Sequence, residues 1–201
     1  MDSRFDTPLG FVQQSSCLVW ENSAMSECVS RDWRAEIVEL VTVQQGLLAL
    51  GDRSPWRVHF PRVAAGEREI SAAEERLRVR LNPQFRSFLT FADGWPGFFQ
   101  DFDLFGTSEL SDDGVQARCA FEASLDESDF GNELGMDFDG LLFIGRSVLN
   151  GDVIVTGTRD GRQCLGVVWY AGGPIEQFDN FQTFFRYMIE LNRREIRAIG
   201  G

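Results

Sequence analysis

The sequence contains no lysine, and all 19 of its basic residues are arginine. A lysine amine therefore cannot act as the nucleophile of Schiff-base chemistry, which leaves only the N-terminus. His59 is the single histidine, so any Ser-His-Asp or Cys-His arrangement would have to use it. The sequence also lacks G-x-S-x-G, P-loop and G-x-G-x-x-G motifs. From these absences we predict that the protein is not an enzyme.

Cysteine is scarce, and the spacing of the four copies matches no zinc-binding or redox pattern: Cys17, Cys28, Cys119 and Cys164. Reduced thiols of this kind are typical of a cytoplasmic protein. We expect no metal and no cofactor. The N-terminal sequence lacks the basic and then apolar run of a signal peptide, and no apolar run approaches the ~20 residues of a membrane span. The sequence therefore predicts a cytoplasmic location.

Acidic residues outnumber basic ones by 31 to 19, and the excess lies in one segment. Residues 93–152 contain 14 aspartates and glutamates but only two arginines, Arg118 and Arg146, so this segment carries the whole net charge of −12. Such a charge disfavours nucleic acid and anionic membranes as partners and favours a basic protein. The alternative is a solvated acidic surface that only keeps the protein soluble. The oligomeric state stays open.

The apolar pattern predicts a polar arm over residues 1–30, followed by one folded domain over residues 31–201. A first helix is expected to end at Gly51 and to carry one apolar face: Ile37, Leu40, Val41, Leu47 and Leu48. Ser71 and Glu74 have the spacing of a capping box, which predicts that a second helix opens there and carries Leu77 and Leu81.

A third helix is predicted after Asn82, because Pro83 suits the first helical position. Its apolar residues recur at helical spacing and are expected to be buried: Phe85, Phe88, Leu89 and Ala92. Gly94 is expected to stop this helix in a left-handed conformation.

Strand patterns follow in the second half of the chain. Apolar runs at 141–144, 153–158 and 164–170 predict strands, and Asp160 and Gly161 suit a tight hairpin turn between the last two. A possible strand covers residues 102–106, and a possible helix covers residues 116–123. Asp179 is expected to cap a closing helix that buries Phe181, Phe184, Phe185 and Met188. The order predicts an α+β fold, a small mixed or antiparallel sheet with helices packed against it.

Residues 70–98 resemble the opening of the SUKH superfamily, which includes the fungal Smi/Knr regulators. In that family a helix ending in a Leu-Pro-like step is followed by a Tyr-Arg-x-Phe-Leu helix and an Asp-Gly-Trp-like turn. The corresponding residues here are Leu81-Asn82-Pro83, Phe85-Arg86-Ser87-Phe88-Leu89 and Asp93-Gly94-Trp95. Downstream, FDLFGTSEL, LLFIGRSVLNGDVIVTG and VVWYAGG are similar to later strands of the family. The resemblance covers roughly residues 55–192.

The resemblance implies a non-catalytic, protein-binding module. Many bacterial members look like immunity proteins, which neutralise a polymorphic toxin, often a nuclease, by binding it. We therefore expect a bacterial immunity protein that occludes the active site of a basic toxin. The alternatives are a cytosolic scaffold or regulatory protein of the same family without a toxin, and a metal-dependent hydrolase that uses the acidic loop.

The acidic segment supplies the candidate partner-binding residues because its carboxylates are interleaved with phenylalanines, a mixture that suits an interface. Asp101, Asp103, Asp112 and Asp113 are expected to be mainly exposed, so that replacing them with Asn leaves stability little changed. Trp95 is open to two interpretations, a buried core residue or the edge of the binding surface. The full candidate set is Asp93, Trp95, Phe98, Asp101, Asp103, Asp112, Asp113, Glu127, Asp129, Asp137 and Asp139.

Overall fold

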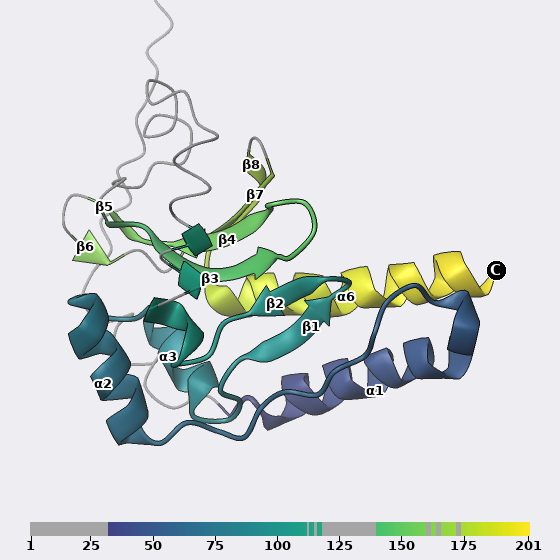
Figure 1. Cartoon of the computed structure of the whole chain (residues 1–201), viewed down its shortest axis with the longest axis horizontal. Helices are drawn as coiled ribbons and strands as arrows, with labels where there is room; N and C mark the ends of the chain where they lie inside the picture. The colour runs from purple at the N-terminus through teal and green to yellow at the C-terminus, as the bar shows by residue number, and fades with distance from the viewer. Residues whose placement is uncertain are drawn as a thin grey trace, which may run out of the picture.

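An antiparallel sheet with helices against it forms the framework of the chain, as the computed structural model in Figure 1 shows. The α+β prediction is therefore confirmed. The structure describes residues 32–111, 113–114, 116–117, 140–159, 162–163, 166–171 and 174–201. The predicted arm at residues 1–30 and most of the possible helix at residues 116–123 lie outside them.

Among the described residues the longest helices are the first and the last, and shorter ones lie between them. They are α1 (Arg34–Leu50), followed by the short 3-10 turn η1 (Gly51–Arg53), then α2 (Glu67–Leu77), α3 (Pro83–Leu89) and α6 (Phe181–Gly200). No helix in the described ranges is long and apolar enough to cross a membrane.

Six strands form the main sheet in the order β1-β2-β3-β4-β7-β8, and every neighbouring pair is antiparallel. The strands are β1 (Trp95–Phe99), β2 (Phe102–Leu104), β3 (Leu142–Ser147), β4 (Val153–Thr156), β7 (Val167–Tyr170) and β8 (Pro174–Phe178). A separate pair, β5 (Thr158–Arg159) and β6 (Arg162–Gln163), extends the hairpin between β4 and β7. The predicted pairing of residues 153–158 with 164–170 is confirmed, whereas β1 and β8 were not predicted.

The first helix is confirmed, and Gly51, with φ of 55°, terminates it as predicted. Its buried face differs from the prediction, because Leu48 is 55% exposed. Two polar residues, Glu36 and Gln44, are buried in its place. Apolar periodicity could not find them, since each is buried through hydrogen bonds rather than through hydrophobic contact.

The capping-box prediction for Ser71 and Glu74 is wrong. Helix α2 begins earlier, after Gly66, whose N–H donates to the Glu69 carboxylate at 2.6 Å. Glu74 lies near the end of the helix and is buried there, where it accepts the N–H of Leu81 at 3.0 Å. Leu81 is buried as well, but beyond the end of the helix.

The caps of the later helices follow local polar chemistry. The Asn82 side chain accepts the N–H groups of Gln84 and Phe85 at 3.0 and 3.3 Å, as predicted for α3. In α6 the cap is Asn180, one residue after the predicted Asp179, and it accepts the N–H of Thr183 at 3.0 Å. Gly94 has the expected positive φ of 83°, although α3 ends at Leu89, before it.

Aromatic side chains from α3, β1 and α6 form the centre of the core together with Trp33, which precedes α1. Phe181 packs its ring 5.2 Å from that of Phe85, and Phe185 lies 5.3 Å from Phe98. These rings meet mainly edge to face or tilted, which is the favoured geometry for aromatic pairs. The following are less than 2% exposed: Trp33, Phe85, Phe88, Trp95, Phe98, Phe181, Phe184 and Phe185.

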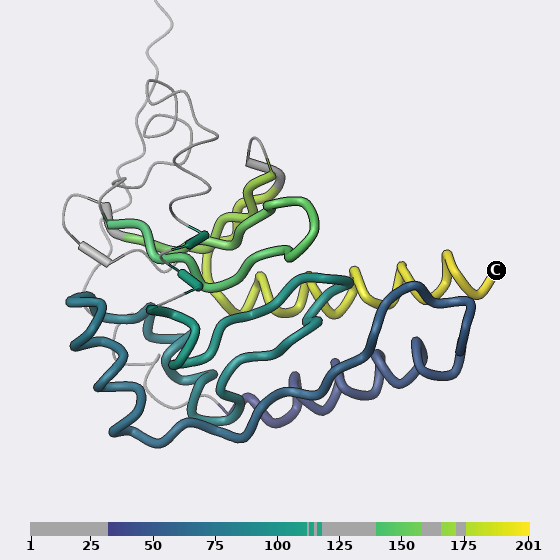
Figure 2. The backbone as a smooth tube through the Cα atoms, viewed as in Figure 1, coloured from purple at the N-terminus to yellow at the C-terminus, as the bar shows by residue number. Residues whose placement is uncertain are grey.

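Helices α1 and α6 lie side by side and run in the same direction, which Figure 2 shows along the tube. Strand β1 is an edge strand of the sheet, and both helices hydrogen-bond to it. Gln44 of α1 donates to the carbonyl oxygens of Gly97 and Phe98 at 3.1 and 3.0 Å, and Asn192 of α6 donates to that of Phe98 at 3.3 Å. Carbonyl groups of the edge strand are thus bonded to buried side chains.

Leu89→Ala should lower the free energy of unfolding by about 2–5 kcal/mol, because Leu89 is fully buried in the core and its truncation leaves a cavity. The matched control is Leu48→Ala, at the exposed leucine of α1, which should change it by about 0.5 kcal/mol or less. Urea unfolding of both variants gives the comparison. Equal losses would contradict the assigned core.

Candidate functional site

The carboxylates of the acidic segment that the structure describes are engaged within the chain. Asp93 accepts the N–H of Thr107 at 2.6 Å and its hydroxyl at 2.9 Å. This contact holds two backbone segments very close, since a Cβ on Gly106 would lie 2.3 Å from the Asp93 carbonyl oxygen. Asp93 is therefore part of the joint between α3 and the segment after β2.

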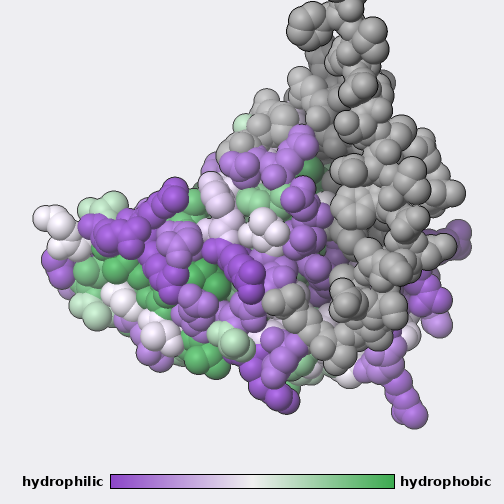
Figure 3. Space-filling view, turned by 180° about the vertical axis from the view of Figure 1, so that it is seen from behind, coloured by the Kyte–Doolittle hydropathy of each residue, from purple (hydrophilic) through white to green (hydrophobic). Residues whose placement is uncertain are grey.

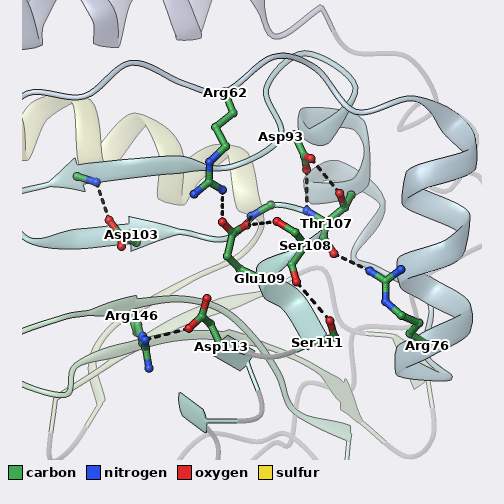
Figure 4. A network of polar contacts seen from close by, with 12 residues as sticks. Arg62, Arg76, Asp93, Asp103, Thr107, Ser108, Glu109, Ser111, Asp113 and Arg146 are labelled. Atoms are coloured by element: carbon green, nitrogen blue, oxygen red, sulfur yellow. Dashed lines mark hydrogen bonds and ion pairs between the residues drawn. The ribbon is translucent and has the colours of Figure 1, made fainter.

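A polar network continues from this joint across the surface, as Figure 4 shows. Glu109 accepts the N–H of Gly106 at 3.0 Å and forms an ion pair with Arg62. Arg76 of α2 donates to the Thr107 carbonyl at 2.8 Å. The network ties together α2, the segment after β2 and the segment before α2 that carries Arg62.

Asp103 and Asp113 also have partners in the chain. Asp103 of β2 accepts the N–H of Gly97 in β1 at 2.7 Å. Asp113 pairs with Arg146 of β3 at 3.0 Å, and both side chains are about one-third exposed. The first contact joins β1 to β2, and the second offsets one negative charge of the acidic segment.

Asp101 shapes the neighbouring turn between β3 and β4. Its carboxylate accepts the hydroxyl of Ser147 and the N–H of Leu149, the latter at 2.9 Å, and its carbonyl accepts the N–H of Val148 at 3.3 Å. Burial alone would raise the pKa of the Asp101 carboxyl, but the hydrogen bonds from Ser147 and Leu149 together hold that pKa below its ordinary value.

Asp152 lies at the other end of the same turn. Its carboxylate accepts the indole N–H of Trp169 at 3.4 Å. Burial raises the pKa of the Asp152 carboxyl, and the nearby charge of Asp101 acts in the same direction, against the hydrogen bond from Trp169. Asp101 and Asp152 thus lie at the same turn, and their pKa values are shifted in opposite directions.

The apolar members of the candidate set are core residues. Trp95 and Phe98 are 0% exposed, so the structure supports the core interpretation of Trp95 and removes both from the surface. The expectation that Asp101, Asp103 and Asp113 are mainly exposed is also wrong, because each is partly buried and hydrogen-bonded. Charge counts cannot show such partners. The remaining members lie outside the described residues: Asp112, Glu127, Asp129, Asp137 and Asp139.

Two apolar side chains at the turn between β3 and β4 were missed. Val148 is 63% exposed and Leu149 is 76% exposed. The turn sits beside the turn between β1 and β2, because Phe102 of β2 pairs with Ser147 of β3 (Figure 1). The sequence did contain a signal, since Val148 and Leu149 stand directly before the turn residues Asn150 and Gly151, where an apolar pair has no strand to join.

Little in the described residues points to chemistry. His59 is exposed, and its carbonyl oxygen accepts the indole N–H of Trp95 at 3.0 Å. Among the described residues no three His, Cys, Asp or Glu side chains form a group that could hold a metal. A hollow lined by Val79, Asn82 and Thr156 has room for about one water molecule.

Comparison with known proteins assigns the family. The sequence profile of the SMI1 / KNR4 family (SUKH-1) matches residues 64–188. The match spans more than half of the chain, so the chain belongs to this family and the resemblance found in the sequence is confirmed. A search of curated proteins finds no match.

Asp101→Asn should lower the free energy of unfolding at pH 7 by on the order of 1 kcal/mol, a modest value because the carboxylate is partly exposed and screened. A pKa lowered by folding means that the ionised Asp101 stabilises the fold above its ordinary value of 3.8, and that this contribution disappears as the pH falls through the lower folded-state pKa. The difference from the parent should therefore shrink below about pH 4.

Asp152→Asn is the control, because it is expected to change the free energy of unfolding in the opposite direction. Its raised pKa means that the ionised carboxylate opposes folding near neutral pH, so removing the charge should preserve or raise stability at pH 7. The gain should vanish at low pH, where Asp152 is protonated in both states. Urea unfolding from pH 3 to pH 7 measures both variants, and equal losses at pH 7 would refute the assigned roles.

Proposed function

We propose that the protein is a non-catalytic binding module that acts in the cytoplasm as an immunity protein and neutralises a basic toxin domain by covering its active site. The observation that carries the proposal is the position of the charge: residues 93–152 hold the entire net charge of −12. Membership of the SUKH family supports it, because that family is associated with immunity to toxins.

Electrostatics supplies the mechanism. A nuclease that holds phosphates needs a basic active site. Carboxylates on this chain take the place of phosphates and steer the toxin into contact, which raises the association rate more than the final affinity. Since Asp93, Asp103 and Asp113 are used within the chain, the steering depends on the field of the whole segment more than on any one of these carboxylates.

A rescue experiment tests the function. Cells that express the toxin domain encoded next to this chain's gene should die, and co-expression of this chain should restore growth. A scaffold or regulatory protein of the same family would bind without restoring growth. Failure of every neighbouring gene product to kill, or failure of this chain to rescue, would refute the immunity function.

The association rate with that toxin domain should fall steeply with salt, because exposed charges are screened beyond roughly 8 Å at physiological ionic strength. Stopped-flow measurements between low and high salt test this. We expect a fall of about tenfold or more. A rate that is flat across the range would show that carboxylates do not guide recognition.

A further inference from the structure

We infer that the partner binds at the turn between β3 and β4, where the exposed pair Val148 and Leu149 enters an apolar hollow rimmed by arginine or lysine, while Asp101 and Asp152 meet that basic rim. We call these four residues the knuckle. The inference rests on the proposed function for the nature of the partner, but the position of the contact follows from the structure.

Hydrogen bonds within the chain hold the knuckle in place. Ser147, 4% exposed, accepts the N–H groups of Leu149 and Asn150 at 3.2 and 3.1 Å and itself donates to Asp101. The Ser147 N–H donates to the Asp152 carbonyl at 2.8 Å, which closes the base of the turn. A turn held by this many bonds loses little conformational freedom on binding, so its apolar side chains contribute most of their burial to affinity.

Strand β7 of the sheet is bonded to the knuckle. Trp169 of β7 donates to Asp152, and its ring packs 6.3 Å from Phe99 and 6.2 Å from Phe102. One carboxylate beside the exposed apolar pair is therefore tied to an aromatic cluster of the sheet. Apolar anchors with a charged rim are the usual composition of a protein interface.

The net charge of the chain distinguishes between two kinds of binding partner, a second copy of this chain and a different protein. Among the described residues, Phe60 and Val63 are also exposed, close in sequence to Arg57 and Arg62, so a second copy of this chain offers one complementary surface. Two copies would each carry −12, however, and would repel at long range. A foreign basic protein meets the same carboxylates without that repulsion, and it is the occupant that the charges favour.

Helix α1 supplies a matched control. Figure 3, seen from behind, shows hydrophobic residues scattered among hydrophilic ones. Val38 and Leu48 of α1 are the same residue types as the knuckle pair and are 63% and 55% exposed. Substituting either pair with serine removes exposed apolar area, so both variants should fold, which melting curves verify.

Photo-crosslinking locates the contact without knowledge of the partner. A benzophenone amino acid is placed at position 149 or, as control, at position 48 of the full chain, which is expressed at its normal level in its own host. We expect an adduct from position 149 to an arginine- or lysine-rich peptide of another protein. An adduct from position 48 alone, an adduct to a second copy of this chain, or no adduct at all would overturn the inference.

Binding measurements with the crosslinked protein, purified, complete the test. The double variant Val148→Ser/Leu149→Ser should weaken binding by about 30-fold or more, as expected for residues at the centre of an interface. The control Val38→Ser/Leu48→Ser should stay within about twofold. A partner that needs the knuckle but is not toxic would refute the immunity function and keep this inference. A toxin that the knuckle variant still binds and neutralises fully would refute this inference and keep the immunity function.

Discussion

Packing on the aromatic face of α6 is the constraint on which the rest of the structure depends. Phe181, Phe184 and Phe185 contact rings from α3, β1 and the residue before α1, so one helix at the end of the chain fixes elements from its first half. The same packing sets α1 parallel to α6, close enough that a Cβ on Gly46 would lie 3.2 Å from Ile196. These contacts are long-range in sequence, so they tie the sheet to the closing helix.

The surface chemistry follows from that core. Since Trp95 and Phe98 are held against α6, β1 has a fixed position, and β2 and β3 continue the sheet from it. The register between β2 and β3 then places Asp101 beside Ser147, where its carboxylate organises the turn that displays Val148 and Leu149. The position of the exposed knuckle therefore depends on the packing of the buried aromatic residues.

Much of the fold could be predicted from the sequence, because its signals are local. The Asn82-Pro83 start of α3, the end of α1 at Gly51 and the aromatic face of α6 all follow from residue type and spacing. The missed features depend on partners outside the element that carries them: Glu74 bonds to Leu81 beyond its helix, and carbonyl groups of β1 bond to Gln44 and Asn192. The exposure of Asp101, Asp103 and Asp113 was mispredicted because counting carboxylates cannot show which are already bonded.

Amide hydrogen exchange of the free protein and of its complex with the crosslinked partner tests the central claim most directly. Binding at the knuckle predicts slowed exchange over residues 99–103 and 146–153, with little change in α1. The backbone N–H of Leu149 is informative because it is already bonded to Asp101, so further protection would report the partner. Slowed exchange over α1 or over residues 54–65, with residues 146–153 unchanged, would contradict the claim.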